Sequence, residues 1–229
     1  MKNISKLESK LGTKFNNQDL LLQALTHRSY LNENPDFRLD HNERLEFLGD
    51  AVLELVVTEY LYKNHLNPEG DLTNWRAALV KAETLAQIAD DLEINGFLLL
   101  SKGEAKDTGR ARQCILANTL EAIIGAIYLD QNYEPVKGFI EKNIIVYLPE
   151  ILEKGEHRDA KSVFQEEAQE RVGVTPTYEV LREWGPDHAK HFSVGVFLNG
   201  DLIAEGEGLS KQEAQLEAAK NALKAKGWE

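Results

Sequence analysis

Cysteine and long apolar runs are what this sequence most clearly lacks. Cys114 is the only cysteine in 229 residues, which excludes an internal disulfide and a cysteine-based zinc site and fits a reducing compartment. No run of eighteen apolar residues occurs, and the N-terminal stretch MKNISKLESKLG lacks the apolar segment of a signal peptide. We therefore expect a soluble, cytoplasmic protein with no membrane partner.

Basic residues are also scarce. The chain has 26 Lys and Arg against 38 Asp and Glu, a formal net charge of −12. Because proteins that bind phosphate backbones usually carry a basic surplus, this balance weighs against a nucleic-acid partner. Hydrophobic residues make up 42% of the chain, which is enough for a core in one or two domains.

The hydrophobic pattern changes along the chain. Residues 1–150 carry helical spacing, and no clear strand pattern precedes residue 170. The polar stretch from Pro149 to Ser162 reads as a linker. After it, residues 177–208 alternate as strands do, with a hairpin-turn signal at Asn199, and a last helix follows the N-cap Ser210. We therefore predict a multi-domain protein, with an all-α domain over residues 1–150 and a small α+β (α-β-β-β-α) domain over residues 159–229.

The stretch NERLEFLGDAVLELVVTEYL, residues 42–61, predicts an unusual helix. It is apolar nearly all round, which indicates burial. Glu43, Glu46 and Asp50 nevertheless fall within an arc of roughly 60° on one side. Two interpretations are equally open: the stripe is a solvated face, or it lies in a cleft. Like charges at these spacings repel one another, which is tolerable in water and costly in a cleft unless a cation is bound there.

The second unusual helix is predicted over residues 115–129, where the polar residues are Asn118, Thr119 and Glu121. A buried carboxylate needs a partner. One interpretation pairs Glu121 with a buried arginine, Arg44 or Arg76. In the other, the two helices pack side by side and their acidic and amide groups converge. Oxygen donors without clustered His or Cys suit Mg²⁺ or Mn²⁺, and such a cluster could activate water and stabilise a phosphoryl transition state.

Motifs along nearly the whole chain resemble those of a known family. NERLEFLGDAVL, PEGDLTNWRAALV and ILANTLEAIIGAIYLD resemble, in this order, the signature stretch, the following segment and the second catalytic helix of ribonuclease III. FQEEAQ, TPTYEV, GPDHAKHF and SKQEAQLEAAKNAL resemble a double-stranded-RNA-binding domain. The resemblance implies a homodimeric endonuclease that hydrolyses double-stranded RNA to 5′-phosphate and 3′-hydroxyl ends, with ribosomal-RNA precursors and other structured transcripts as expected substrates.

The resemblance also implies roles for individual residues. It assigns catalytic roles to Asp50 and Glu121. It implies Mg²⁺, with Mn²⁺ as a substitute and no small-molecule cofactor, held by Glu46, Asp50, Asn118 and Glu121. It assigns accessory acidic roles to Glu43 and Glu69. The residues expected to contact RNA, which such domains recognise mainly by shape, are Gln165, Glu166, Pro186, His188 and Lys211.

Three positions depart from the family pattern. Asn118 and Gln113 stand where the family usually has Asp and Glu. The last helix opens with Lys211, Gln212 and Glu213, where two or three basic residues are usual. An alternative function is therefore open: a catalytically weak or inactive homologue that only binds double-stranded RNA. The carboxylates retained elsewhere favour an enzyme, and the amide oxygen of Asn118 can still bind Mg²⁺. A purely structural helical dimer does not account for the C-terminal domain.

Overall fold

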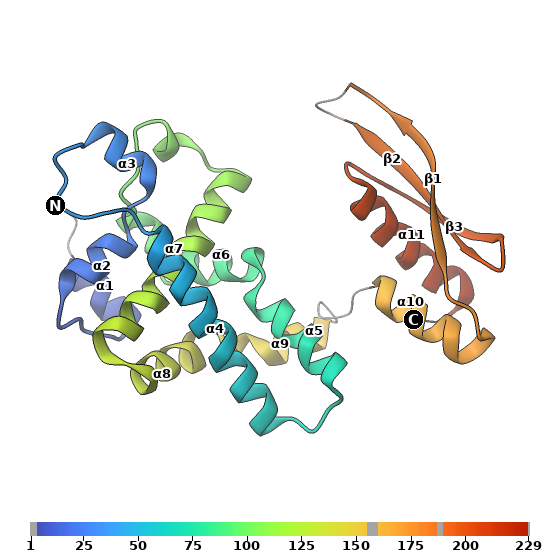
Figure 1. Cartoon of the computed structure of the whole chain (residues 1–229), viewed down its shortest axis with the longest axis horizontal. Helices are drawn as coiled ribbons and strands as arrows, with labels where there is room; N and C mark the ends of the chain where they lie inside the picture. Colours follow the sequence, from blue (N-terminus) through green and yellow to red (C-terminus); the bar gives the residue numbers. More distant parts are fainter. Residues whose placement is uncertain (1–3, 155–159, 187–189, 229) are drawn as a thin grey trace. The chain divides into compact units, whose positions relative to one another are not determined.

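The computed structural model describes residues 4–154, 160–186 and 190–228, and the chain divides into two compact units, Met1–His157 and Arg158–Glu229 (Figure 1). We describe each unit by itself. His188, one of the expected RNA contacts, lies outside the described residues. No helix in the described ranges is both long and apolar enough to cross a membrane.

The first unit is helical, as the sequence predicts. Its α-helices are α1 (Ile4–Leu11), α2 (Gln18–Ala24), α3 (Arg28–Glu33), α4 (Glu43–Asn64), α5 (Glu69–Val80), α6 (Ala82–Asp91), α7 (Arg110–Gln131), α8 (Tyr133–Asn143) and α9 (Leu148–Lys154). Short 3-10 turns lie at Ile94–Phe97, Glu104–Lys106 and Ile145–Tyr147. The two helices with unusual polar stripes are α4 and α7, which pack against each other, while α2, α6 and α8 also contact α7 (Figure 1).

Two glycines set the crossing of α4 and α7. A Cβ atom at Gly49 would lie 1.8 Å from the backbone oxygen of Glu121, and one at Gly125 would lie 2.3 Å from the backbone oxygen of Leu45. The two backbones are therefore in direct contact, at a distance that a residue larger than glycine does not allow. This contact brings the polar stripe of α4 alongside that of α7.

The second unit contains α10 (Ala160–Val172), β1 (Thr177–Trp184), β2 (His191–Leu198), β3 (Asp201–Gly208) and α11 (Lys211–Lys226). The strands form an antiparallel sheet in the order β1-β2-β3. The predicted hairpin turn is confirmed by positive φ angles at Asn199 (52°) and Gly200 (87°). Ser210 caps α11, since its side chain accepts from the backbone N–H of Glu213. The α-β-β-β-α prediction is confirmed.

The predicted linker from Pro149 is wrong over its first residues. Helix α9 runs through Lys154, and Leu148 and Ile151 are buried in the core of the first unit. These residues are three positions apart, which places both on one helical face. Burial of that apolar face against the first unit outweighs the polar composition on which the linker interpretation rested.

Candidate functional site

The helix crossing brings together four predicted site residues. Glu46 and Asp50 are one turn apart on α4, and Asn118 and Glu121 are one turn apart on α7. Glu46, Asn118 and Glu121 are half-buried, whereas Asp50 is exposed. The acidic stripe of α4 is therefore partly solvated, since Glu43 and Asp50 are exposed and Glu46 is half-buried beside α7. We call these four residues the acidic cluster.

The electrostatics of the acidic cluster are those of uncompensated negative charge. Burial, followed by the charges of Asp50 and Glu46, raises the pKa of Glu121 to about 7. Burial and the neighbouring Glu43 raise the pKa of Glu46, while a hydrogen bond from the Asn118 side chain opposes this rise. In the part of the chain that the structure describes, no Lys or Arg pairs with Glu121.

The arginines considered as partners for Glu121 are engaged or oriented elsewhere. Arg76 donates to the hydroxyl of Thr58 at 3.0 Å, and Arg44 is exposed on α4. The interpretation of Glu121 as one half of a buried ion pair is therefore wrong. A half-buried carboxylate that meets two others is the charge pattern that a bound cation would neutralise.

The donors fit a hard divalent cation by type. The acidic cluster offers three carboxylates and one amide oxygen from two packed helices, without clustered His or Cys, and this donor set suits Mg²⁺ or Mn²⁺. Among the described residues, however, no three Asp, Glu, His or Cys side chains are grouped closely enough to hold a metal ion as they stand. Burial, followed by the charges of Asp50 and Glu46, disfavours the ionised form of Glu121 when no cation is bound. Binding an ion would require these side chains to rotate toward one another.

The raised pKa of Glu121 predicts a pH-dependent gain in stability for Glu121→Gln in chelator. Below the unfolded pKa of 4.5, both states hold the proton and the substitution should change little. As pH rises to about 7, the unfolded chain ionises before the folded one, so wild-type stability falls and glutamine avoids that loss. After allowance for solvent screening, we expect a gain of about 1–2 kcal/mol at pH 8. Melting curves at pH 4, 6 and 8 check this, and a difference that is independent of pH would contradict it.

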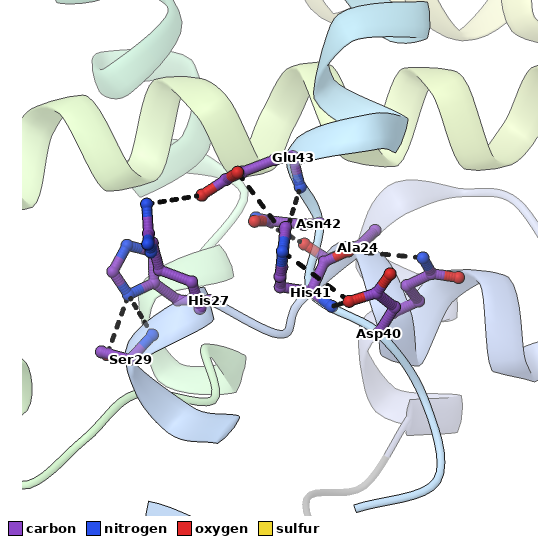
Figure 2. A network of polar contacts seen from close by, with 9 residues as sticks. Ala24, His27, Ser29, Asp40, His41, Asn42 and Glu43 are labelled. Atoms are coloured by element: carbon purple, nitrogen blue, oxygen red, sulfur yellow. Dashed lines mark hydrogen bonds and ion pairs between the residues drawn. The ribbon is translucent and has the colours of Figure 1, made fainter. Parts of the chain in front are cut away.

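Glu43 lies at the start of α4, within a polar network that also contains basic side chains (Figure 2). Its carboxylate is 3.5 Å from the guanidinium of Arg28 and 3.8 Å from the ring of His41. The Asn42 side chain donates to the backbone oxygen of Ala24 and so ties the start of α4 to the end of α2. Glu43 is exposed and borders the acidic cluster, since its charge raises the pKa of Glu46.

His27, Arg28 and His41 are residues of this network that the sequence interpretation did not single out. The ring of His27 is 2.8 Å from the hydroxyl of Ser29, and burial is the main reason that its pKa is lowered. The sequence did contain a signal for His41, because this residue directly precedes the signature stretch that begins at Asn42. The basic stretch at residues 27–28 could not be connected to Glu43 without the fold, because the two segments belong to different helices.

Glu69 is not part of the acidic cluster within one chain. It begins α5 and is exposed, and it lines a cleft of about 780 Å³ between the C-terminal half of α4 and α5. Other residues along this cleft include Tyr62, Leu66 and Arg76. At 1.5 Å per residue, Tyr62 is about 24 Å along α4 from Glu46. The cleft that Glu69 and Tyr62 line is therefore separate from the acidic cluster.

The described RNA-contact candidates of the second unit are all exposed. Gln165 and Glu166 lie on α10, Pro186 follows β1, and Lys211 opens α11. Their exposure leaves them available to a ligand.

The comparisons with known proteins agree with these two units. A family model described as Ribonuclease-III-like matches residues 17–148, and one for the double-stranded RNA binding motif matches residues 160–226. The chain is 47% identical over 223 residues to Ribonuclease 3 of Carboxydothermus hydrogenoformans (96% of this chain, 94% of the relative). It is 45% identical over 218 residues to Ribonuclease 3 of Pelotomaculum thermopropionicum (95% and 90%).

A solved structure also matches the first unit. The nuclease domain of ribonuclease III from Campylobacter jejuni is 45% identical, with a TM-score of 0.58 over 65% of this chain and 98% of that domain. A Ribonuclease-III-like helical domain followed by a double-stranded RNA binding motif indicates a nuclease that acts on double-stranded RNA. The chain belongs to the ribonuclease III family and is a double-stranded-RNA-specific endoribonuclease. This family uses a divalent metal ion.

Proposed function

We propose that this protein hydrolyses double-stranded RNA with Mg²⁺ to 5′-phosphate and 3′-hydroxyl ends, and that it processes ribosomal-RNA precursors and other structured transcripts in the cytoplasm. The proposed domains are residues 1–150 for cleavage and 159–229 for RNA binding. The observation that carries the proposal is the close crossing of α4 and α7, which places the half-buried Glu121 beside the charges of Asp50 and Glu46.

The reaction needs the acidic cluster to do two things. In hydrolysis, a water oxygen bonds to phosphorus, the bond from phosphorus to the 3′ oxygen breaks, and that oxygen takes up a proton. Glu46, Asp50, Asn118 and Glu121 would hold the ion, which would supply water activation and charge stabilisation when bound. Asp50, the exposed carboxylate of the cluster, would face the attacking water, while the crossing of α4 and α7 holds the other donors in place.

A cleavage assay tests the proposed function. Long duplex RNA would be incubated with the protein and Mg²⁺, with chelator and single-stranded RNA of the same sequence as matched controls. We expect Mg²⁺-dependent cleavage of the duplex alone, giving fragments that a 5′-phosphate-dependent exonuclease degrades. Duplex binding without cleavage would instead favour the alternative, a homologue that binds RNA and does not cut it.

Asn118 is the specific observation behind that alternative, and Asn118→Asp tests its role. The added carboxylate should bind a hard cation more tightly than the amide does, so we expect half-maximal cleavage at a lower Mg²⁺ concentration. In chelator, the variant should melt earlier than wild type, because a fourth negative charge joins the cluster. Adding Mg²⁺ should then stabilise the variant more than wild type. If the two Mg²⁺ titrations of cleavage superimpose, position 118 does not ligate the ion.

The homodimer proposal is supported by one face of α4. Phe47, Leu55 and Tyr62 are 81%, 57% and 78% exposed, and together with the exposed Ala51 they fall within an arc of about 80° on the helix. This exposed apolar stripe, along which Arg44 and Thr58 also lie, marks an interaction surface. One solved structure of the Campylobacter jejuni nuclease domain shows structural flexibility in the region involved in dimer formation of that protein. We infer that a second copy of this chain covers the stripe.

Phe47→Glu should convert the dimer to a monomer. The substitution places a charge where the most exposed aromatic ring of the stripe would be buried, a cost of several kcal/mol on association. Gel filtration with light scattering would measure the mass. Val146→Glu, at an apolar position that is 58% exposed in the 3-10 turn Ile145–Tyr147, is the comparison outside the stripe. An unchanged dimer in the Phe47 variant would place the interface elsewhere.

A further inference from the structure

Two lysines of the second unit converge on one carboxylate. The ammonium of Lys190, just before β2, is 3.0 Å from Glu183 on β1, and the ammonium of Lys211, at the start of α11, is 3.3 Å from the other oxygen of the same carboxylate. Hydrogen bonds from Lys190 and then Lys211 lower the pKa of Glu183. Three segments of the chain therefore meet at a cluster of two positive charges and one negative charge.

An aromatic ring supports the same two lysines. The ammonium groups of Lys190 and Lys211 lie 5.9 and 5.6 Å from the centre of the Phe192 ring, within the range of a cation–π attraction. Phe192 pairs in register with Gly208, which packs against the backbone of α11. The cluster is therefore on the face of the sheet that carries α11.

We propose that Glu183 sets the affinity of this protein for double-stranded RNA, by holding Lys190 and Lys211 as a pair and neutralising part of their charge. This inference rests on the proposed contact of Lys211 with an RNA phosphate. It assigns Lys190 to the same phosphate-binding pair, although Lys190 lies outside α11 and far from Lys211 in the sequence.

The sign of the effect follows from charge. A phosphate that approaches the two ammonium groups also approaches the Glu183 carboxylate, which repels it. Removing that charge leaves two full positive charges, and the Phe192 ring still supports both lysines. The residues after Lys211 are Gln212 and Glu213, so Lys190 supplies a second positive charge that the start of α11 itself lacks.

Binding of the full chain to a duplex RNA in chelator, which prevents cleavage, tests the inference. At about 0.1 M salt, Glu183→Gln should bind about three to five times more tightly, and Lys190→Gln should bind more weakly by a similar factor. The log–log salt dependence should steepen for Glu183→Gln and become shallower for Lys190→Gln, each by up to about 0.9. The double variant, whose net charge equals that of wild type, should lose most of the gain.

Glu179→Gln is the matched control, since it removes the same charge from the same strand. Glu179 pairs with Gly195, whose Cβ position faces Leu181 and Leu202, on the side of the sheet away from α11. It should change the affinity by less than about twofold. Equal effects at positions 179 and 183, or weaker binding by Glu183→Gln, would overturn the inference alone. A wild-type chain that does not bind the duplex would overturn the RNA-binding function as well.

Discussion

Cleavage of duplex RNA by Glu121→Gln should fall by about 10³-fold, while its affinity for the same duplex in chelator should change less than about twofold. Glutamine keeps the shape and one oxygen of the side chain but removes its negative charge. Burial, followed by the charges of Asp50 and Glu46, raises the pKa of the Glu121 carboxyl to about 7. Loss of a charged ligand costs several kcal/mol of transition-state stabilisation, and about 4 kcal/mol corresponds to 10³ in rate.

The affinity arm separates loss of chemistry from loss of binding. The proposed RNA contacts lie on the second unit, whereas Glu121 lies on α7 in the first. Glu134→Gln, which removes the same charge from an exposed position on α8, is the control and should cleave at the wild-type rate. Wild-type cleavage by Glu121→Gln would show that the acidic cluster is not the active site. A parallel loss of duplex binding would indicate that Glu121 acts through the RNA contact instead.

Gly49→Ala should destabilise the protein by about 3 kcal/mol or more, and cleavage should fall by at least about 100-fold under conditions where the variant is folded. The added methyl would lie 1.8 Å from the backbone oxygen of Glu121. Relief requires α4 and α7 to separate, because the obstructing atom belongs to the backbone and not to a flexible side chain. That separation would move Glu46 and Asp50 away from Asn118 and Glu121.

Gly138→Ala is the matched substitution on α8, where an added methyl meets nothing within 4 Å. Alanine favours a helix over glycine, so this control should stabilise the protein by about 0.5–1 kcal/mol. Thermal melting and a cleavage assay performed below both melting temperatures make the comparison. A Gly49→Ala variant as stable and as active as Gly138→Ala would show that the spacing of α4 and α7 does not determine the site.

The sequence by itself determined the features that depend on neighbouring residues. Apolar spacing predicts α4 and α7, and spacings of three and four residues place Glu46 and Asp50 on one stripe and Asn118 and Glu121 on another. Strand alternation, the turn at Asn199 and the cap at Ser210 likewise depend on short segments. The order of motifs indicated the family, because motif recognition needs residue types and spacing and no three-dimensional contact.

Only the tertiary structure decided which stripes face each other and how their charges are balanced. Gly49 and Gly125 are 76 positions apart in the sequence, yet their contacts set the helix crossing and thereby place the polar stripes of α4 and α7 side by side. The same holds for Lys190 and Lys211, which share Glu183 across three segments. Helix α9 forms where composition indicated a linker, because Ile151 is buried in the hydrophobic core of the first unit. Each of these outcomes depends on burial and on Coulomb interactions between distant segments, and local periodicity contains no information about such contacts.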